Sequence, residues 1–206
     1  MEKMEIKSFT LAQLREEMGR LGEKPFRAAQ LYEWMHGKLA RGYEEMSNIP
    51  AAMKVKCGES YSYTALKTVQ VQESAVDGTK KFLFALSDVN LVESVWMRYR
   101  HGNSVCISSQ VGCRMGCRFC ASTLDGLVRN LTPAEMLDQI YAITLETGER
   151  VSNVVVMGSG AYRRERPSYQ PAKRYGIHLR HCARNAASGA GEIADYAGAF
   201  PACGNR

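Results

Sequence analysis

Residues 104–120 read SVCISSQVGCRMGCRFC, and residues 131–160 read LTPAEMLDQIYAITLETGERVSNVVVMGSG. SVCISS has the character of a strand that leads into a cysteine-rich loop. Thr132 to Glu135 spell a capping box with proline at the first helical position, and the helix that follows ends near Gly148. NVVVM is a continuous apolar strand. Strand, loop, helix and strand form a βαβ unit, which predicts a parallel sheet with ligands at the carboxyl ends of its strands.

The segment from residue 1 to residue 60 predicts a small helical domain. Its first helix has apolar residues at spacings of three and four, and Ser8 or Thr10 is placed to cap it. A second helical pattern follows Pro25 and stops near Gly37, and a loop then leads into a further short helix. We expect this domain to precede the sheet.

From residue 61 to residue 100 the hydrophobic period changes to two, which predicts three strands that lead into the βαβ unit at residues 101–160. The last of them, NLVESVWMRY, puts Glu93 on the same face as three apolar residues. A carboxylate there has two interpretations. It is either a charge of an edge strand in water or a functional group.

Charge and composition divide the chain near residue 160. Residues 1–160 hold 19 Lys plus Arg against 18 Asp plus Glu, whereas residues 161–206 hold 8 against 3. Residues 161–206 have ten alanines, seven arginines and no sustained hydrophobic period. We expect this tail to be a frameshifted or disordered segment, so that its arginines carry no information about RNA binding. The N-terminus lacks a signal peptide and no segment predicts a membrane span, which indicates a cytoplasmic protein.

Cysteine spacing indicates a metal centre. In a reducing compartment, seven cysteines with four of them between residues 106 and 120 favour metal binding or thiol chemistry over disulfides. Cys113, Cys117 and Cys120 form CxxxCxxC, which can bind three irons of a [4Fe–4S] cluster and leave the fourth iron open to a small molecule. Structural zinc is the alternative, but no second Cys or His pair lies at a fitting distance. Phe119 is placed to shield such a cluster from water.

These motifs resemble the radical S-adenosylmethionine superfamily, and more closely its RlmN/Cfr group of RNA adenine methyltransferases. The resemblance rests on CISSQVGCRMGCRFCAST, RNLTPAEMLDQI and NVVVMGSG, with KPFRAAQLYEWMH and EEMSNIP upstream. It runs from the first helix to about Gly160. It implies the start of a TIM-type (β/α) barrel behind a helical domain that contacts RNA.

The resemblance also implies cofactors, partners and residue roles. The cofactors are a [4Fe–4S] cluster on Cys113, Cys117 and Cys120, together with S-adenosylmethionine. The substrates are 23S rRNA and tRNA, methylated at C2 of an adenine, or at C8 in Cfr relatives. An electron donor such as a flavodoxin-type reductant would serve a monomeric enzyme. Glu93 matches the proton acceptor, and Cys106 matches the thiol that resolves a protein–RNA crosslink.

The sequence departs from the family pattern after residue 160. Gly158, Ser159 and Gly160 match the start of the segment that binds S-adenosylmethionine, but Ala161 follows where the family has Glu-Pro. Cys203, in PACGNR, has only a short match to the cysteine that carries the methyl group. We therefore expect this chain by itself to lack activity. The alternative function is a non-catalytic iron–sulfur or zinc module with RNA contacts.

Overall fold

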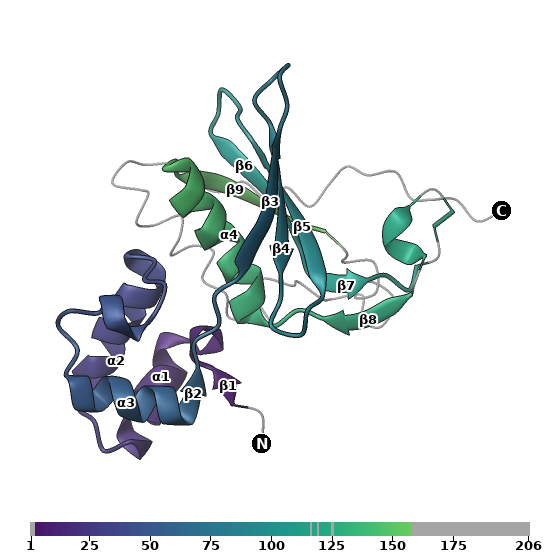
Figure 1. Ribbon diagram of the computed structural model, residues 1–206. Helices are drawn as coiled ribbons and strands as arrows, with labels where there is room; N and C mark the ends of the chain where they lie inside the picture. The colour runs from purple at the N-terminus through teal and green to yellow at the C-terminus, as the bar shows by residue number, and fades with distance from the viewer. Residues whose placement is uncertain (1–2, 116, 119, 125, 158–206) are drawn as a thin grey trace.

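The computed structural model describes residues 3–115, 117–118, 120–124 and 126–157 (Figure 1). It has a helical region at the N-terminus, followed by a mixed sheet with one long helix against it. The predicted α/β class, in which a small helical part precedes the sheet, is confirmed. The predicted frameshifted tail, residues 161–206, lies outside the described residues.

Amphipathic helices build the helical region around an apolar core of their own, which includes Ile6, Leu14, Leu31 and Met53. Thr10 caps the first helix through a capping box with Gln13, so of the two candidate caps Thr10 is the correct one. The second helix ends in a π-helical turn before Gly37. The elements are β1 (Met4–Glu5), η1 (Ile6–Ser8), α1 (Leu11–Arg20), α2 (Pro25–Tyr32), η2 (Glu33–Gly37), η3 (Tyr43–Glu45), α3 (Ala51–Ser60) and β2 (Tyr61–Ser62).

The main sheet has five strands in the order β3-β4-β5-β6-β9. Only β6 and β9 run parallel, as the βαβ unit predicts, and the other neighbours are antiparallel. The parallel pairing predicted from the βαβ unit is confirmed for β6 and β9. The sequence predicted no direction for β3 to β5, and they are antiparallel because short connections join β3 to β6 as hairpins. The strands are β3 (Lys67–Glu73), β4 (Lys80–Ala85), β5 (Leu91–Met97), β6 (Asn103–Ser108) and β9 (Val151–Met157).

Helix α4 (Pro133–Thr147) covers one face of this sheet (Figure 1). Its predicted capping box is present, with Thr132 as the N-cap and Glu135 bonding back to it, and Gly148 ends the helix with a φ of 64°. Aromatic and aliphatic side chains of the strands pack beneath the helix, among them Phe82, Phe84 and Trp96. Among the described residues no helix covers the opposite face, where Val155 of β9 is 46% exposed.

A buried ion pair joins the helical region to α4. Lys7 and Asp138 are each 4% exposed, and the Lys7 Nζ lies 2.6 Å from Asp138 Oδ1. Lys7 also donates to the carbonyl oxygen of Thr64 at 2.9 Å and lies over the Tyr63 ring. Burial raises the pKa of Asp138 to about 6, although the charge of Lys7 opposes this shift. The other carboxylate oxygen, Oδ2, has no hydrogen-bond partner in the described part of the chain.

Two weaker polar contacts lie along the same interface between the helical region and α4. The Ser8 hydroxyl accepts from the backbone N–H of Ala134 at 3.1 Å, in the first turn of α4. The Thr132 hydroxyl donates to the Glu5 carboxylate. The N-terminal segment thus satisfies donors at the start of α4 that the helix itself leaves free. No helix in the described part of the chain is long and apolar enough to cross a membrane.

Lys7→Met is expected to lower the free energy of unfolding by about 3–5 kcal/mol, because it leaves the Asp138 carboxylate buried without a cation. Urea unfolding followed by circular dichroism measures this loss. The double variant Lys7→Met/Asp138→Leu should recover most of it, since neither charge remains. Lys3→Met is the control, because Lys3 only bonds the exposed carbonyl oxygen of Gly58. A loss for Lys7→Met no larger than that for Lys3→Met would contradict the expectation.

Candidate functional site

Glu93 and Cys106 share the face of the sheet that α4 leaves uncovered. Val95 of β5 pairs with Cys106 of β6, and Glu93 lies two residues from Val95 on the same face. Glu93 and Cys106 are therefore diagonal neighbours across two strands, the arrangement in which long side chains reach each other. Structure and sequence agree in bringing these two candidates together at the carboxyl end of β6.

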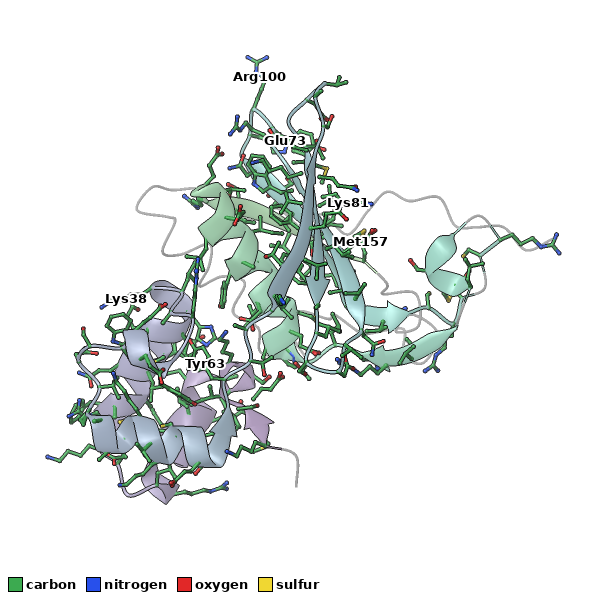
Figure 2. All side chains as sticks on the ribbon, viewed as in Figure 1. Lys38, Tyr63, Glu73, Lys81, Arg100 and Met157 are labelled. Atoms are coloured by element: carbon green, nitrogen blue, oxygen red, sulfur yellow. The ribbon has the colours of Figure 1, made fainter. Side chains whose placement is uncertain are left out.

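Glu93 is not on an edge strand, because β5 pairs with β4 on one side and β6 on the other. The interpretation of Glu93 as a charge on an edge strand is therefore wrong about the strand. The Glu93 side chain is nevertheless 56% exposed to water. Its carboxylate lies 3.1 Å from the Lys81 Nζ of the neighbouring strand β4. In Figure 2 the labelled Lys81 stands on the sheet, well away from Lys38 and Tyr63 in the helical region. Lys81 is a residue that sequence reasoning did not single out.

Among the described residues two thiols lie outside the cysteine loop, and burial affects them to different extents. Burial raises the pKa of Cys106, so this thiol is protonated at neutral pH. Cys57 lies on α3 in the helical core, and burial raises its pKa to about 11. The intermediate exposure of Cys106 leaves it reachable by a substrate, whereas Cys57 is fully buried.

A two-stranded antiparallel ladder that the sequence did not predict carries the cysteine loop. It consists of β7 (Gln110–Gly112) and β8 (Leu127–Asn130), and Cys113, Cys117 and Cys120 lie between them. The Cys113 N–H donates to the carbonyl oxygen of Gly126 at 2.9 Å and closes the loop at its base. The short helix η4 (Ala121–Thr123) follows the last cysteine.

Backbone hydrogen bonds shape the second half of the loop. The Cys120 N–H donates to the carbonyl oxygen of Cys117 at 3.1 Å. The Thr123 hydroxyl lies 3.1 Å from the carbonyl oxygen of Cys117 and 2.8 Å from that of Cys120. Phe119 lies outside the described residues, as do Gly158, Ser159 and Gly160, so their predicted cofactor contacts stay predictions.

The donor set of the loop fits an iron–sulfur cluster chemically, since its three thiols are free and each is partly accessible. In the described part of the chain, however, no three His, Cys, Asp or Glu side chains lie close enough together to bind one metal ion. The loop would therefore have to draw its thiols together when a cluster binds. Its hydrogen-bonded base keeps both ends fixed while it does so.

A buried carboxamide next to the loop has no partner. Gln110 begins β7, three residues before Cys113, and is 5% exposed. Neither its Oε1 nor its Nε2 has a hydrogen-bond partner among the described groups. Leaving such atoms unpaired costs about 1–3 kcal/mol. The unpaired carboxamide of Gln110 supports a binding role for the region of the cysteine loop. Sequence reasoning missed Gln110, because a glutamine ahead of a cysteine motif gives no signal of such a role.

Gly112 allows the base of the loop to close. Its φ is 71°, and a Cβ at this position would lie 2.0 Å from the carbonyl oxygen of Gly126. The same oxygen accepts the hydrogen bond from Cys113. Gly126 has the same φ of 71°, but a Cβ there would meet nothing within 4 Å. A side chain at Gly112 would therefore cause both backbone strain and a steric clash, whereas a side chain at Gly126 would cause backbone strain alone.

Gly112→Ala is expected to speed hydrogen exchange at the Cys113 amide by about tenfold or more, because the methyl group displaces the Gly126 carbonyl. Gly126→Ala is the matched control, and it should add only the backbone strain of about 1–2 kcal/mol. Exchange measured by NMR or by mass spectrometry of peptides checks both. Equal effects of the two substitutions on Cys113 would show that steric contact does not control the loop.

Comparisons with known proteins agree with this architecture. Residues 4–61 match the family model of the ribosomal RNA large subunit methyltransferase N-terminal domain. Two bacterial proteins named "Probable dual-specificity RNA methyltransferase RlmN" are similar to the chain. The protein from Lachnospira eligens is 64% identical over 156 residues, which are 76% of this chain and 45% of the relative. The protein from Lachnoclostridium phytofermentans is 56% identical over 159 residues, 77% of this chain and 45% of the relative.

A solved structure extends the likeness to the fold. The crystal structure of a radical SAM methyltransferase from Sphaerobacter thermophilus matches with a TM-score of 0.73 and 30% identity, over 86% of this chain and 53% of that one. The chain spans about half the length of the curated relatives it matches. The resemblance predicted from the motifs is confirmed: the N-terminal part matches the family model, and the part of the chain up to the cysteine loop and β9 is similar to proteins named RlmN and to a radical SAM methyltransferase.

Proposed function

We propose that this chain carries the first part of an RlmN-like enzyme that transfers a methyl group to C2 of an adenine in 23S rRNA and in tRNA. One observation carries the proposal. Glu93 and Cys106 lie on one uncovered face of the sheet, at the end of β6 that leads through β7 into the cysteine loop. A carboxylate, a thiol and a cysteine loop toward one end of the sheet support the proposal, because the reaction would need a base, a nucleophile and metal ligands.

The cysteine loop would hold the metal cofactor. Cys113, Cys117 and Cys120 would bind three irons of a [4Fe–4S] cluster and leave the fourth to S-adenosylmethionine. When bound, this group would supply radical chemistry, which suits C2 of adenine because that carbon is weakly nucleophilic and polar transfer from a sulfonium would be slow. An electron donor such as a flavodoxin-type protein would provide the electron.

Two residues of the sheet would act on the substrate. Glu93 would accept the proton that the methylated ring must lose, and the Lys81 ammonium at 3.1 Å would hold its carboxylate in place. The Cys106 thiolate would attack the sulfur of the cysteine that carries the methyl group in the family, so that a disulfide forms, the carbon–sulfur bond to the RNA breaks, and the released carbon takes up a proton. Since burial raises the pKa of Cys106, the thiol must lose its proton to a neighbouring base before this attack.

The helical region offers a surface for RNA, which we call the aromatic stripe. It consists of Phe26, Arg27 and Gln30 of α2, Trp34 of η2 and Lys38, which follows η2. Phe26, Gln30, Trp34 and Lys38 recur every four residues, the spacing at which side chains of a helix are neighbours. Arg27 lies over the Phe26 ring at 4.9 Å and Lys38 over the Trp34 ring at 3.8 Å. Aromatic faces beside cations are the groups on which unpaired RNA bases stack.

Phe26→Ala is expected to weaken binding of a single-stranded RNA oligonucleotide by about fivefold or more, because base stacking on one aromatic ring contributes about 1–3 kcal/mol. Val55→Ala is the matched control, since both side chains are apolar and more than half exposed on helices of the same region. Fluorescence anisotropy at constant salt concentration measures the affinity. Equal affinities of the two variants would remove the stripe from the proposed RNA surface.

Anaerobic reconstitution with iron and sulfide tests the proposed cofactor. The wild-type chain should bind iron with an absorption spectrum that changes when S-adenosylmethionine is added, and Cys117→Ser should reduce bound iron severalfold. Cys57→Ser is the control, because Cys57 lies in the helical core. A colourless protein with one bound zinc would instead support the alternative function, a non-catalytic module.

Methyl transfer itself is expected to be absent from the purified 206-residue chain, because Ala161 stands where the family has the glutamate that contacts S-adenosylmethionine. Mass spectrometry of rRNA fragments incubated with the reconstituted protein checks this. Appearance of methylated adenine would contradict the expected inactivity, and the position of the methyl group would decide between C2 and C8.

A further inference from the structure

The ladder between β5 and β6 stops just where the candidate site begins. Its paired positions run from Met97 and Ser104 to Val95 and Cys106. Both strands continue past this point, β5 back to Leu91 and β6 on to Ser108. The two strands that carry Glu93 and Cys106 therefore lose their mutual backbone pairing beside these residues. Another group must satisfy the backbone of Ser108 there.

That group is the side chain of Gln139, which reaches the end of the ladder from α4 and is fully buried. Its Oε1 accepts from the Ser108 N–H at 2.9 Å and from the Ser94 hydroxyl at 2.7 Å. Its Nε2 donates to the Ser108 carbonyl oxygen at 2.9 Å and to that of Glu135 at 3.2 Å. A carboxamide has two acceptor sites and two donor hydrogens, so all four are used.

We propose that Gln139 is a positioning residue that sets the spacing between Glu93 and Cys106. Ser94 is next to Glu93 in β5, and Ser108 is two residues from Cys106 in β6, so one carboxamide holds both strands beside the two functional groups. The Ser108 hydroxyl adds a second link on the uncovered face by donating to the Glu93 carbonyl oxygen at 2.7 Å. The inference rests on the proposed function, which gives Glu93 and Cys106 their roles.

Two features make Gln139 suited to this task. The carboxamide has the donor and acceptor of a peptide group, so it replaces the missing strand partner without leaving a backbone group unpaired. A buried polar network with every member satisfied is rigid, because any rotation of the carboxamide would break bonds that water cannot replace. An apolar side chain of the same size would fill the space but would leave Ser108 and Ser94 without partners.

Gln139→Glu gives a test that depends on the hydrogen-bond pattern rather than on size. A protonated carboxyl can donate to the Ser108 carbonyl oxygen and accept from the Ser108 N–H, as the amide does. The ionised form has no donor and places negative charge against the carbonyl oxygens of Ser108 and Glu135. Hydrogen exchange at the Ser108 amide, corrected for the intrinsic rate, should therefore match wild type near pH 5. It should become about tenfold faster near pH 8.

Gln139→Leu should show the fast exchange at both pH values. It should also raise the rate at which iodoacetamide alkylates Cys106 at pH 8 by about fivefold, since loss of the ladder partner exposes β6. Peptide mass spectrometry follows Cys106 and Cys57 separately, and Cys57 should not change. Thr144→Val is the matched control, because it removes a side-chain hydrogen bond from the same helix that does not reach the sheet.

Unchanged Ser108 exchange and Cys106 alkylation in Gln139→Leu would overturn the proposal. If Gln139→Leu unfolds instead, the pH series of Gln139→Glu decides, and exchange that is fast at both pH values would also overturn it. These measurements require neither cluster nor RNA. Failure of Cys117→Ser to change iron binding would count against the proposed function and leave the result for Gln139 intact.

Discussion

Asp138 and Gln139, two adjacent polar residues on the buried side of α4, make the buried polar contacts that join this helix to the helical region and to the sheet. Asp138 bonds Lys7 of the helical region, and Gln139 bonds Ser94 and Ser108 of the sheet. Both side chains are almost without contact with water, where an unpaired charge or amide would cost several kcal/mol. Each therefore requires its partner, and this requirement fixes the helical region and the sheet against the same helix.

This arrangement connects packing with the proposed chemistry. The face of α4 with apolar side chains buries Phe82, Phe84 and Trp96 and gives the sheet one dry side. The other side of the sheet stays accessible, and Glu93, Lys81 and Cys106 point to it. Parallel pairing of β6 and β9 directs both strands toward the cysteine loop, as expected for sites at the carboxyl ends of strands.

The cysteine loop is held at its base by the ladder of β7 and β8. Gly112 and Gly126 let its two ends meet, and the hydrogen bond from Cys113 to Gly126 closes it. Between these ends the thiols are free, so that binding of a metal group can gather them without moving β7 and β8. The buried, unpaired carboxamide of Gln110 lies at the start of this support. Polar groups of this kind are retained more readily near binding regions than in a purely structural core.

The sequence by itself determined the features that depend on local spacing. The capping box at Thr132, a helix cap at Ser8 or Thr10, the hydrophobic periods, the βαβ unit and the three cysteines of the loop were predictable, because each depends on residue types at short spacings. The structure chose Thr10 over Ser8 as the cap. Only the tertiary structure decided the antiparallel order of β3 to β6 and the ladder around the cysteine loop. It alone also revealed the bonds of Lys7 and Gln139, whose partners lie 131 and 31 residues away. Hydrogen-bond partners so far apart in the sequence leave no periodic pattern in it, because they become neighbours only when the chain folds.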